Sequence, residues 1–283
     1  MGSQNIHSLL KGVFADFKHY ESVMEIRKNF GFISGAPLET QPVEMRKGQN
    51  ISGYGVGIMY LDNVWYPMMP GNVVNAWTYD FPVRLKAVEG LDTPTLHSGK
   101  PEVFESILAT AKQLEKEGCR AICSACGFFG HFHQKLKDEM DIPVALSSLV
   151  QVPWIRSTIK SNVKIGILTA NAVAMNDGIL QSTGIGHGDD LVIADLRHGE
   201  NFSAIMEDRG SFDNAGTKRE VVSAAVKMVE ENPDIGAILL ECSDMPPYAA
   251  DIQAATGRSV YDFITLIKWL NNAAMQRPYS GWI

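Results

Sequence analysis

From Tyr54 onward, short continuous apolar runs alternate with segments whose apolar residues recur at helical spacing. A continuous apolar run such as residues 55–61 is typical of a parallel strand that helices cover on both faces. The pattern predicts strands at residues 55–61, 119–125, 142–147, 163–169, 190–195, 235–241 and 259–263. It predicts helices at residues 101–117, 128–140, 171–183, 214–231, 248–256 and 264–275. This alternation indicates an α/β fold with parallel sheets, in which ligands bind beyond the carboxyl ends of the strands.

The residues before Tyr54 follow a different pattern. Residues 5–33 have apolar positions at helical spacing and predict one or two amphipathic helices, whereas residues 34–50 contain prolines and predict a linker. We therefore expect an N-terminal helical extension with its linker over residues 1–50. Such an extension would pack on the body or on a neighbouring subunit, which suggests a homo-oligomer.

The body repeats its pattern, and a cysteine stands at the same place in each half. Cys126 and Cys242 each follow a short apolar run, and 18 positions after each of them a valine (Val144 or Val260) opens the next run. In a fold with two-fold symmetry, thiols at these positions would lie on opposite sides of one cleft. Two facing thiols can remove and return a proton at carbon without a metal or a cofactor.

The chemistry of these thiols depends on their ionisation. A thiol acts as a base only as its thiolate, and its ordinary pKa of ~8.5 is low enough for a modest effect to ionise it. Because Cys126 and Cys242 each precede a predicted helix, we expect the helix N-terminus to favour the thiolate. Either cysteine alone would more often be structural, so the prediction depends on the matched pair. Strand alternation predicts that Glu241 points to the face opposite Cys242.

Strand ends and one aromatic loop supply candidate substrate contacts. Residues at strand ends that could bind a substrate carboxylate, or alternatively cap helices, are Asp62, Thr169, Ala170, Asn171 and Ser243. The loop over residues 63–82 carries four aromatic residues, Trp65, Tyr66, Trp77 and Tyr79, and Trp154 could join them. Their faces could form a cage for a sulfonium or quaternary ammonium group, and the alternative is a lid or a subunit contact.

Composition restricts the class of partner. The net charge is −7, hydrophobic residues make up 45% and charged residues 20%, which is ordinary for a soluble globular protein. The negative charge argues against nucleic acid or an anionic membrane as a partner and mildly favours cationic ligands. No apolar stretch approaches the ~18 residues that a membrane span needs. The first residues do not predict a signal peptide, so we expect a cytoplasmic protein whose four cysteines are free thiols.

No cofactor is expected. The glycine runs do not lie between a strand and a helix as a dinucleotide fingerprint requires, and Walker, H-E-x-x-H and G-x-S-x-G motifs are absent from the sequence. Cys123 and Cys126 form a C-x-x-C, with His131 and His133 nearby. A zinc site would need further ligands at suitable spacing, so metal binding is a minor alternative. His97 taken alone is more often a core or surface residue than a catalyst.

Several short motifs carry a resemblance to a known family. They are Tyr66-Pro67 with Pro70-Gly71, Asp80-Phe81-Pro82-Val83, Cys126-Gly127-Phe128, and the run from Leu240 to Ala249. The two-cysteine pattern resembles the aspartate/glutamate/hydantoin racemase superfamily over about residues 54–270. The motifs are most similar to the Alma-type dimethylsulfoniopropionate (DMSP) lyases of algae and to bacterial racemase-like relatives. The resemblance implies two α/β lobes with the site between them, Cys126 and Cys242 as catalytic thiols, and a dimer or tetramer.

One departure from the amino-acid racemases bears on the substrate. Those enzymes typically carry Asn-Thr after the first cysteine, where this chain has Gly127-Phe128, so groups that would hold an α-amino group are missing there. We expect Gly127 and Phe128 to contact a substrate whose methylated head forms few hydrogen bonds. The expected lobes are residues 51–157 with 264–283, and residues 158–263.

The function expected from the resemblance is abstraction of a proton α to a carboxylate by a cofactor-independent lyase. The substrate would be a small carboxylate that carries a sulfonium group, and the products dimethyl sulfide and acrylate. The first alternative is an aspartate, glutamate or hydantoin racemase, and the second is a non-catalytic binding protein. Maleate isomerase and arylmalonate decarboxylase activities are minor options within the same superfamily.

Overall fold

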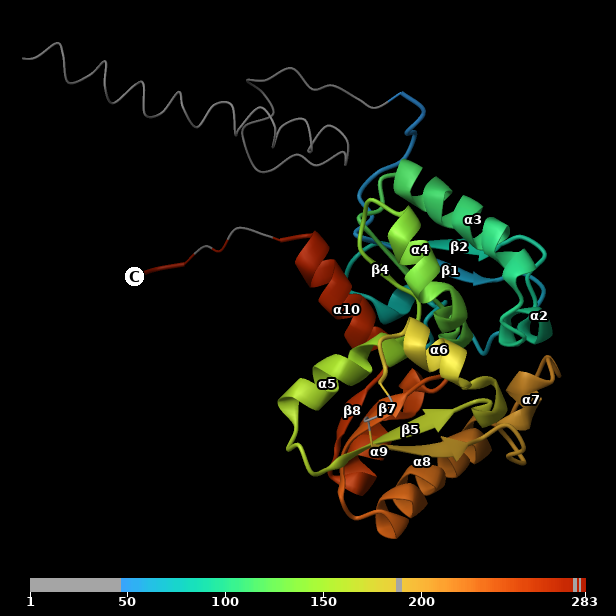
Figure 1. Cartoon of the computed structure of the whole chain (residues 1–283), viewed down its shortest axis with the longest axis vertical. Helices are drawn as coiled ribbons and strands as arrows, with labels where there is room; N and C mark the ends of the chain where they lie inside the picture. Colours follow the sequence, from blue (N-terminus) through green and yellow to red (C-terminus); the bar gives the residue numbers. More distant parts are fainter. Residues whose placement is uncertain (1–46, 187–189, 277–278, 280) are drawn as a thin grey trace, which may run out of the picture. The chain divides into compact units, whose positions relative to one another are not determined.

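A computed structural model describes residues 47–186, 190–276, 279 and 281–283 (Figure 1). The predicted helices over residues 5–33 lie outside the described residues. The described residues up to Gly53 group with Lys116–Gly118, where the Gln49 side chain donates to the carbonyl oxygen of Glu117 at 3.4 Å. The second compact unit, formed by the rest of the chain from Tyr54 onward, contains both cysteines and every strand named below.

The first sheet has four parallel strands in the order β2-β1-β3-β4. These strands are β1 (Val56–Leu61), β2 (Val83–Val88), β3 (Ala121–Ser124) and β4 (Val144–Ala145). The helices that accompany them are α2 (Thr93–His97), α3 (Phe104–Lys116), α4 (His133–Glu139), α5 (Val152–Thr158) and, from the end of the chain, α10 (Phe263–Ala274). α10 packs on β1 and β3, while Leu114 of α3 faces Gly57 of β1. β1 is therefore covered on both faces, which explains its continuous apolar sequence.

The second sheet repeats this arrangement in the order β6-β5-β7-β8, again with parallel strands. Its strands are β5 (Lys164–Thr169), β6 (Leu191–Asp195), β7 (Ile235–Leu240) and β8 (Ser259–Tyr261). Its helices are α6 (Asp177–Ser182), α7 (Ser203–Met206), α8 (Asn214–Glu231) and α9 (Ala249–Thr256). Figure 1 shows α8 and α9 grouped with β5, β7 and β8, and α3 and α4 grouped with β1, β2 and β4. The prediction of an α/β fold with two parallel, helix-flanked sheets is confirmed.

Strand register makes the two halves equivalent residue by residue. Ile122 of β3 pairs with Val144, and Ile238 of β7 pairs with Val260. Each isoleucine lies four positions before a cysteine of the matched pair. Cys126 and Cys242 therefore stand two residues beyond the ends of equivalent strands, at the carboxyl edge of each sheet.

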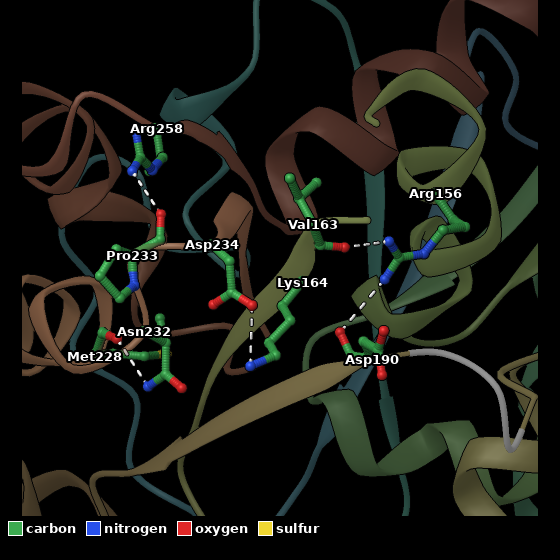
Figure 2. A network of polar contacts seen from close by, with 9 residues as sticks. All are labelled: Arg156, Val163, Lys164, Asp190, Met228, Asn232, Pro233, Asp234 and Arg258. Carbon is green, nitrogen blue, oxygen red and sulfur yellow. Dashed lines mark hydrogen bonds and ion pairs between the residues drawn. The ribbon is translucent and has the colours of Figure 1, made fainter. Parts of the chain in front are cut away.

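Polar contacts tie together the opposite, amino end of the second sheet (Figure 2). Lys164 at the start of β5 forms an ion pair with Asp234 before β7 (3.0 Å). Arg156 of α5 donates to the carbonyl oxygens of Val163 (2.5 Å) and Asp190 (3.3 Å), which precede β5 and β6. These contacts join the starts of β5, β6 and β7 at the edge of the sheet opposite to the cysteine.

The structure also contains elements that the pattern did not predict. β2 carries the sequence VRLKAV, and five of its six residues are partly exposed at the sheet edge, so its apolar signal is weak. α2, α5 and α7 are likewise unpredicted. Several predicted helices begin with 3-10 turns, which lie at Pro101–Val103, Gly127–Phe132, Ala172–Ala174 and Pro246–Tyr248, with others at Ala76–Thr78 and Ser148–Gln151. Among the described residues, no helix has the length and apolar character that crossing a membrane would require.

Candidate active site

A pocket at the carboxyl edge of both sheets contains both matched cysteines. Its cavity volume is about 40 Å³, and its walls come from both halves of the fold. The first half contributes Leu61, Val64, Trp65, Tyr66, Thr93, His97, Ala125, Cys126, Gly127 and Phe128. The second half contributes Ala170, Ile205, Met206, Asp208, Glu241, Cys242, Ser243 and Asp244. The lining residues include three carboxylates and no lysine or arginine among the described residues.

Cys126 is held where β3 turns into the 3-10 helix Gly127–Phe132. The Ala125 backbone N–H donates to the Met59 carbonyl oxygen (2.8 Å), which continues the β1–β3 ladder past the strand end. The Ala125 carbonyl oxygen accepts from the Tyr66 hydroxyl (3.1 Å) and from the Ser243 hydroxyl (3.0 Å). Both halves of the fold therefore position the residue before Cys126.

Cys242 is paired with a carboxylate. Its Sγ lies 3.6 Å from Asp244 Oδ2 and donates to it, and the other oxygen, Asp244 Oδ1, accepts from Asn72 Nδ2 at 2.6 Å. Burial raises the pKa of Asp244 to about 6, partly offset by these two hydrogen bonds. Asn72 is fully buried and belongs to the first half, so this triad also joins the two halves.

Both thiols have pKa values far above the ordinary range. Burial raises the pKa of Cys126, and the nearby charges of Glu241 and Asp244 add to the effect. Burial also raises the pKa of Cys242, again with contributions from Asp244 and Glu241. Hydrogen bonds from the backbone N–H groups of Phe128 to Cys126 and of Asp244 to Cys242 oppose the rise without cancelling it. The expectation that a helix start would favour the thiolates is wrong, because burial and the neighbouring carboxylates outweigh the effect of the helix start on the thiol pKa values.

Glu241 lines the pocket, so the prediction that it points away from Cys242 is wrong. β7 ends at Leu240, so strand alternation no longer governs residue 241, and the side chain lines the same pocket as both thiols. Its Oε2 accepts from the Thr169 hydroxyl (2.9 Å), while its buried Oε1 has no hydrogen-bond partner among the described residues. A Cβ atom at position 127 would overlap Oε1, so glycine is required there. Burial raises the pKa of Glu241 to about 7, opposed by the Thr169 and Ala170 hydrogen bonds.

His97 presents a neutral imidazole to the pocket. Arg197 can only donate, so its contact with Asn171 Oδ1 (3.3 Å) leaves Asn171 Nδ2 to donate to His97 Nδ1 (3.1 Å). The proton of the neutral ring therefore sits on Nε2, where it is available to a ligand. Burial and the Arg197 charge lower the pKa of His97 to about 4, which keeps the ring uncharged at neutral pH. Its ring centroid lies 4.0 Å from that of Phe128.

The sequence is similar to proteins of known activity. No family model matches the chain. A dimethylsulfoniopropionate lyase from Durusdinium sp. clade D is 31% identical over 258 residues, which cover 89% of this chain and 85% of that protein. The chain belongs to the DMSP lyase family. Dimethylsulfoniopropionate lyase 7 from Emiliania huxleyi is 29% identical, with 80% of this chain and 69% of that protein covered.

Solved structures agree on the fold of this DMSP lyase family member. Unliganded arylmalonate decarboxylase has a TM-score of 0.52 at 14% identity and covers 80% of this chain and 94% of its own. Allantoin racemase from Pseudomonas fluorescens has a TM-score of 0.52 at 13% identity, with 80% and 99% covered. The chain therefore has the fold shared by arylmalonate decarboxylase and allantoin racemase, as the motifs implied.

The structure brings together most of the predicted site residues of this family member. Those that line the pocket are Trp65, Tyr66, Cys126, Gly127, Phe128, Ala170, Cys242 and Ser243. Trp65 also packs edge-on against Phe212 of the second half, with ring centroids 5.7 Å apart. The Ser243 hydroxyl donates to the Ala125 carbonyl oxygen, so its proton is not available for a hydrogen bond to the substrate.

Five predicted contact residues do not line this pocket. Asp62 is exposed and accepts from the Gly90 backbone N–H (3.0 Å). Trp77 is 86% exposed, and the Tyr79 hydroxyl is buried and donates to the Val73 carbonyl oxygen (2.9 Å). Thr169 and Asn171 stand one step behind the pocket, where they position Glu241 and His97.

The aromatic cage is correspondingly smaller than predicted. Trp154 lies with Trp269 and Tyr261, with ring centroids 6.3 Å and 5.9 Å away, and does not line the pocket. The aromatic residues that do line it are Trp65, Tyr66 and Phe128. Within the described part of the chain, no cluster of three or more His, Cys, Asp or Glu residues could hold a metal ion.

Sequence reasoning missed Glu241, Asp244, His97 and Asp208 as pocket residues. A signal for the first two was available, because both lie within two positions of Cys242 at a strand end. Asp208 reaches the pocket from an irregular segment after α7, where its φ of 52° is a left-handed value and its Oδ1 accepts from the Trp65 backbone N–H (2.9 Å). No pattern in the local sequence predicts that such a residue lines the pocket.

Proposed function

We propose that this protein cleaves the carbon–sulfur bond of DMSP without a cofactor, with one thiolate of the Cys126–Cys242 pair as the base that removes the proton. The observation that carries the proposal is the composition of one pocket. It holds both thiols with three carboxylates and three aromatic side chains, and its described lining contains no basic side chain of lysine or arginine.

The charge of the pocket favours this substrate over acidic amino acids. Aspartate and glutamate bring two carboxylates and one ammonium group, and the carboxylates of Asp208, Glu241 and Asp244 would repel them. DMSP has one carboxylate and one sulfonium, so its positive end matches the acidic wall. Faces of aromatic side chains attract such cations by roughly 0.5–2 kcal/mol.

The reaction is a β-elimination that needs one base. The thiolate removes a proton from the carbon next to the substrate carboxylate, and the carbon–hydrogen electron pair becomes the new carbon–carbon double bond. The carbon–sulfur bond breaks with its electron pair on sulfur, which leaves neutral dimethyl sulfide and acrylate. The proton stays on the thiol and later passes to solvent. No acid is needed for the leaving group, whereas racemisation would need both thiols.

The positive charge of the substrate itself lowers the pKa of the base. Because burial and carboxylates raise the thiol pKa values, the thiols are protonated before substrate binds. A sulfonium placed among these groups favours their anionic forms and so lowers the pKa of the base. Cys242 is the better placed base, because it donates to the Asp244 carboxylate, which can take up the thiol proton and leave the thiolate. The Nε2–H of His97 is a neutral donor for the negative charge that develops on the substrate carboxylate.

Gas chromatography of the headspace tests the proposal. Purified protein incubated with DMSP should release dimethyl sulfide and acrylate in equal amounts, and treatment with a chelator should leave the rate unchanged. Cys242→Ala should lower kcat by about 10²–10⁴-fold, the usual contribution of a proton-transfer group. Cys123→Ala removes a buried thiol outside the pocket and is the matched control. If wild type releases no more dimethyl sulfide than Cys126→Ala and Cys242→Ala, the proposal is wrong.

A further inference from the structure

Glu241 carries a buried oxygen that the protein leaves unpaired. The residue is fully buried, Oε2 accepts from Thr169, and Oε1 has no partner among the described residues. An unsatisfied buried acceptor ordinarily costs about 1–3 kcal/mol. The carboxylate nevertheless occupies the space that a side chain at position 127 would need. The fold keeps this space for the acid group by placing a glycine opposite it.

The chemistry of the missing partner follows from the surroundings. Lysine and arginine are absent from the described lining, so any positive charge at Oε1 has to come from a ligand. The other two pocket carboxylates are less suitable. Both oxygens of Asp244 are occupied by hydrogen bonds, and Asp208 is exposed and accepts from a backbone N–H. Glu241 is the buried carboxylate with an oxygen free.

A cation without hydrogen-bond donors fits this oxygen. An ammonium group would demand several acceptors to satisfy its N–H groups, whereas of the two buried carboxylates in the described lining only Glu241 has an oxygen without a hydrogen bond. A sulfonium carries no N–H or O–H, so it needs only charge and apolar contact. Gly127, Phe128 and Cys242 line the same cavity as Glu241 and provide such contact.

We propose that the Glu241 carboxylate is the subsite for the substrate's sulfonium, with Gly127 conserving the space that this carboxylate requires. The identity of the cation rests on the proposed function, but the preference for a donor-free cation is a property of the pocket. Glu241 then determines specificity through binding, and a thiol of the Cys126–Cys242 pair carries out the proton transfer.

Binding of two unreactive probes tests the subsite. 3-(Trimethylammonio)propanoate is a cation without N–H groups, and 4,4-dimethylpentanoate is its uncharged isostere with the same carboxylate. Calorimetric titration of wild type should give a preference for the cationic probe of about tenfold or more, as a charge pair in a partly screened site implies. Glu241→Gln should abolish the preference while leaving the affinity for the uncharged probe unchanged or improved. Asp244→Asn removes a pocket carboxylate whose oxygens are already occupied and should retain most of the preference.

Every outcome of these titrations either supports or refutes the Glu241 subsite. The subsite is refuted if wild type shows no preference, if Glu241→Gln keeps it, or if Asp244→Asn loses as much of it as Glu241→Gln. Glu241→Asp withdraws the charge by one methylene and should give an intermediate preference, so it decides the question if Glu241→Gln does not fold. A wild type that releases dimethyl sulfide while Glu241→Gln keeps the preference refutes only the subsite. A wild type that shows the Glu241-dependent preference but releases no dimethyl sulfide refutes only the lyase.

Discussion

Replacing Glu241 by glutamine should change how the stability of the protein depends on pH. Burial raises the pKa of Glu241 from its ordinary 4.5 to about 7 in the folded state. The unfolded chain therefore releases this proton at lower pH than the folded protein. Between these two values the unfolded state binds fewer protons, so the free energy of unfolding falls as pH rises. Above pH 7 the loss is complete.

The size of the effect follows from the pKa difference. One pKa unit corresponds to about 1.36 kcal/mol, so the shift of Glu241 costs the folded protein about 3 kcal/mol above pH 7. Glutamine keeps an acceptor for the Thr169 hydroxyl and removes the charge. The difference in the free energy of unfolding between Glu241→Gln and wild type at pH 4.5 serves as the reference. The variant should gain about 3 kcal/mol on wild type by pH 8.

Urea denaturation at pH 4.5, 6, 7 and 8 measures this gap. The exposed Glu89, changed to glutamine, controls for the loss of one carboxylate from the chain. The reasoning is refuted if the free energy of unfolding of Glu241→Gln minus that of wild type stays constant across the pH range, or if it decreases as pH rises. A constant difference would mean that Glu241 is not held in the buried, charge-opposing environment described above.

Further predictions concern the neighbours of the two thiols. Gly127→Ala places a Cβ onto Glu241 Oε1 and should destabilise the protein by roughly 1–3 kcal/mol, measured as a lower midpoint of urea unfolding; an unchanged midpoint would contradict the overlap. Asn72→Ala removes the amide that donates to Asp244, so the pKa of Asp244 should rise further above 6, and the acid limb of the kcat/KM profile should move to higher pH. Alkylation of Cys126 by iodoacetamide at pH 7, followed by mass spectrometry, should be slower than that of a free model thiol, because its raised pKa leaves little thiolate; faster alkylation would contradict this.

The fold and the thiol pair were accessible from the sequence because each depends on local, repeated signals. Apolar runs marked the strands that helices cover on both faces, such as β1 and β5, and equal spacing marked Cys126 and Cys242. β2 was not predicted, because an edge strand with charged residues has little of the apolar pattern that marks a buried strand. The pattern thus identifies buried strands and the residues that end them.

The rest of the pocket depends on contacts between distant segments. Glu241 was placed on the wrong face because β7 ends one residue before it, and a strand end cannot be located to a single residue from apolar pattern alone. His97 is positioned by Asn171, some seventy residues away, and the Asp244 triad needs Asn72 from the other half. Trp77 and Tyr79 share the loop and chemistry of Trp65 and Tyr66 but do not line the pocket. Such pairings arise only once the chain has folded.

The most direct test of the central claim compares two substrates in one preparation of the enzyme. DMSP should be converted to dimethyl sulfide and acrylate, while L-glutamate incubated in heavy water should gain no deuterium at its α-carbon, because the acidic pocket disfavours a second carboxylate. Deuterium incorporation into glutamate without any release of dimethyl sulfide from DMSP would contradict the account and identify a racemase instead.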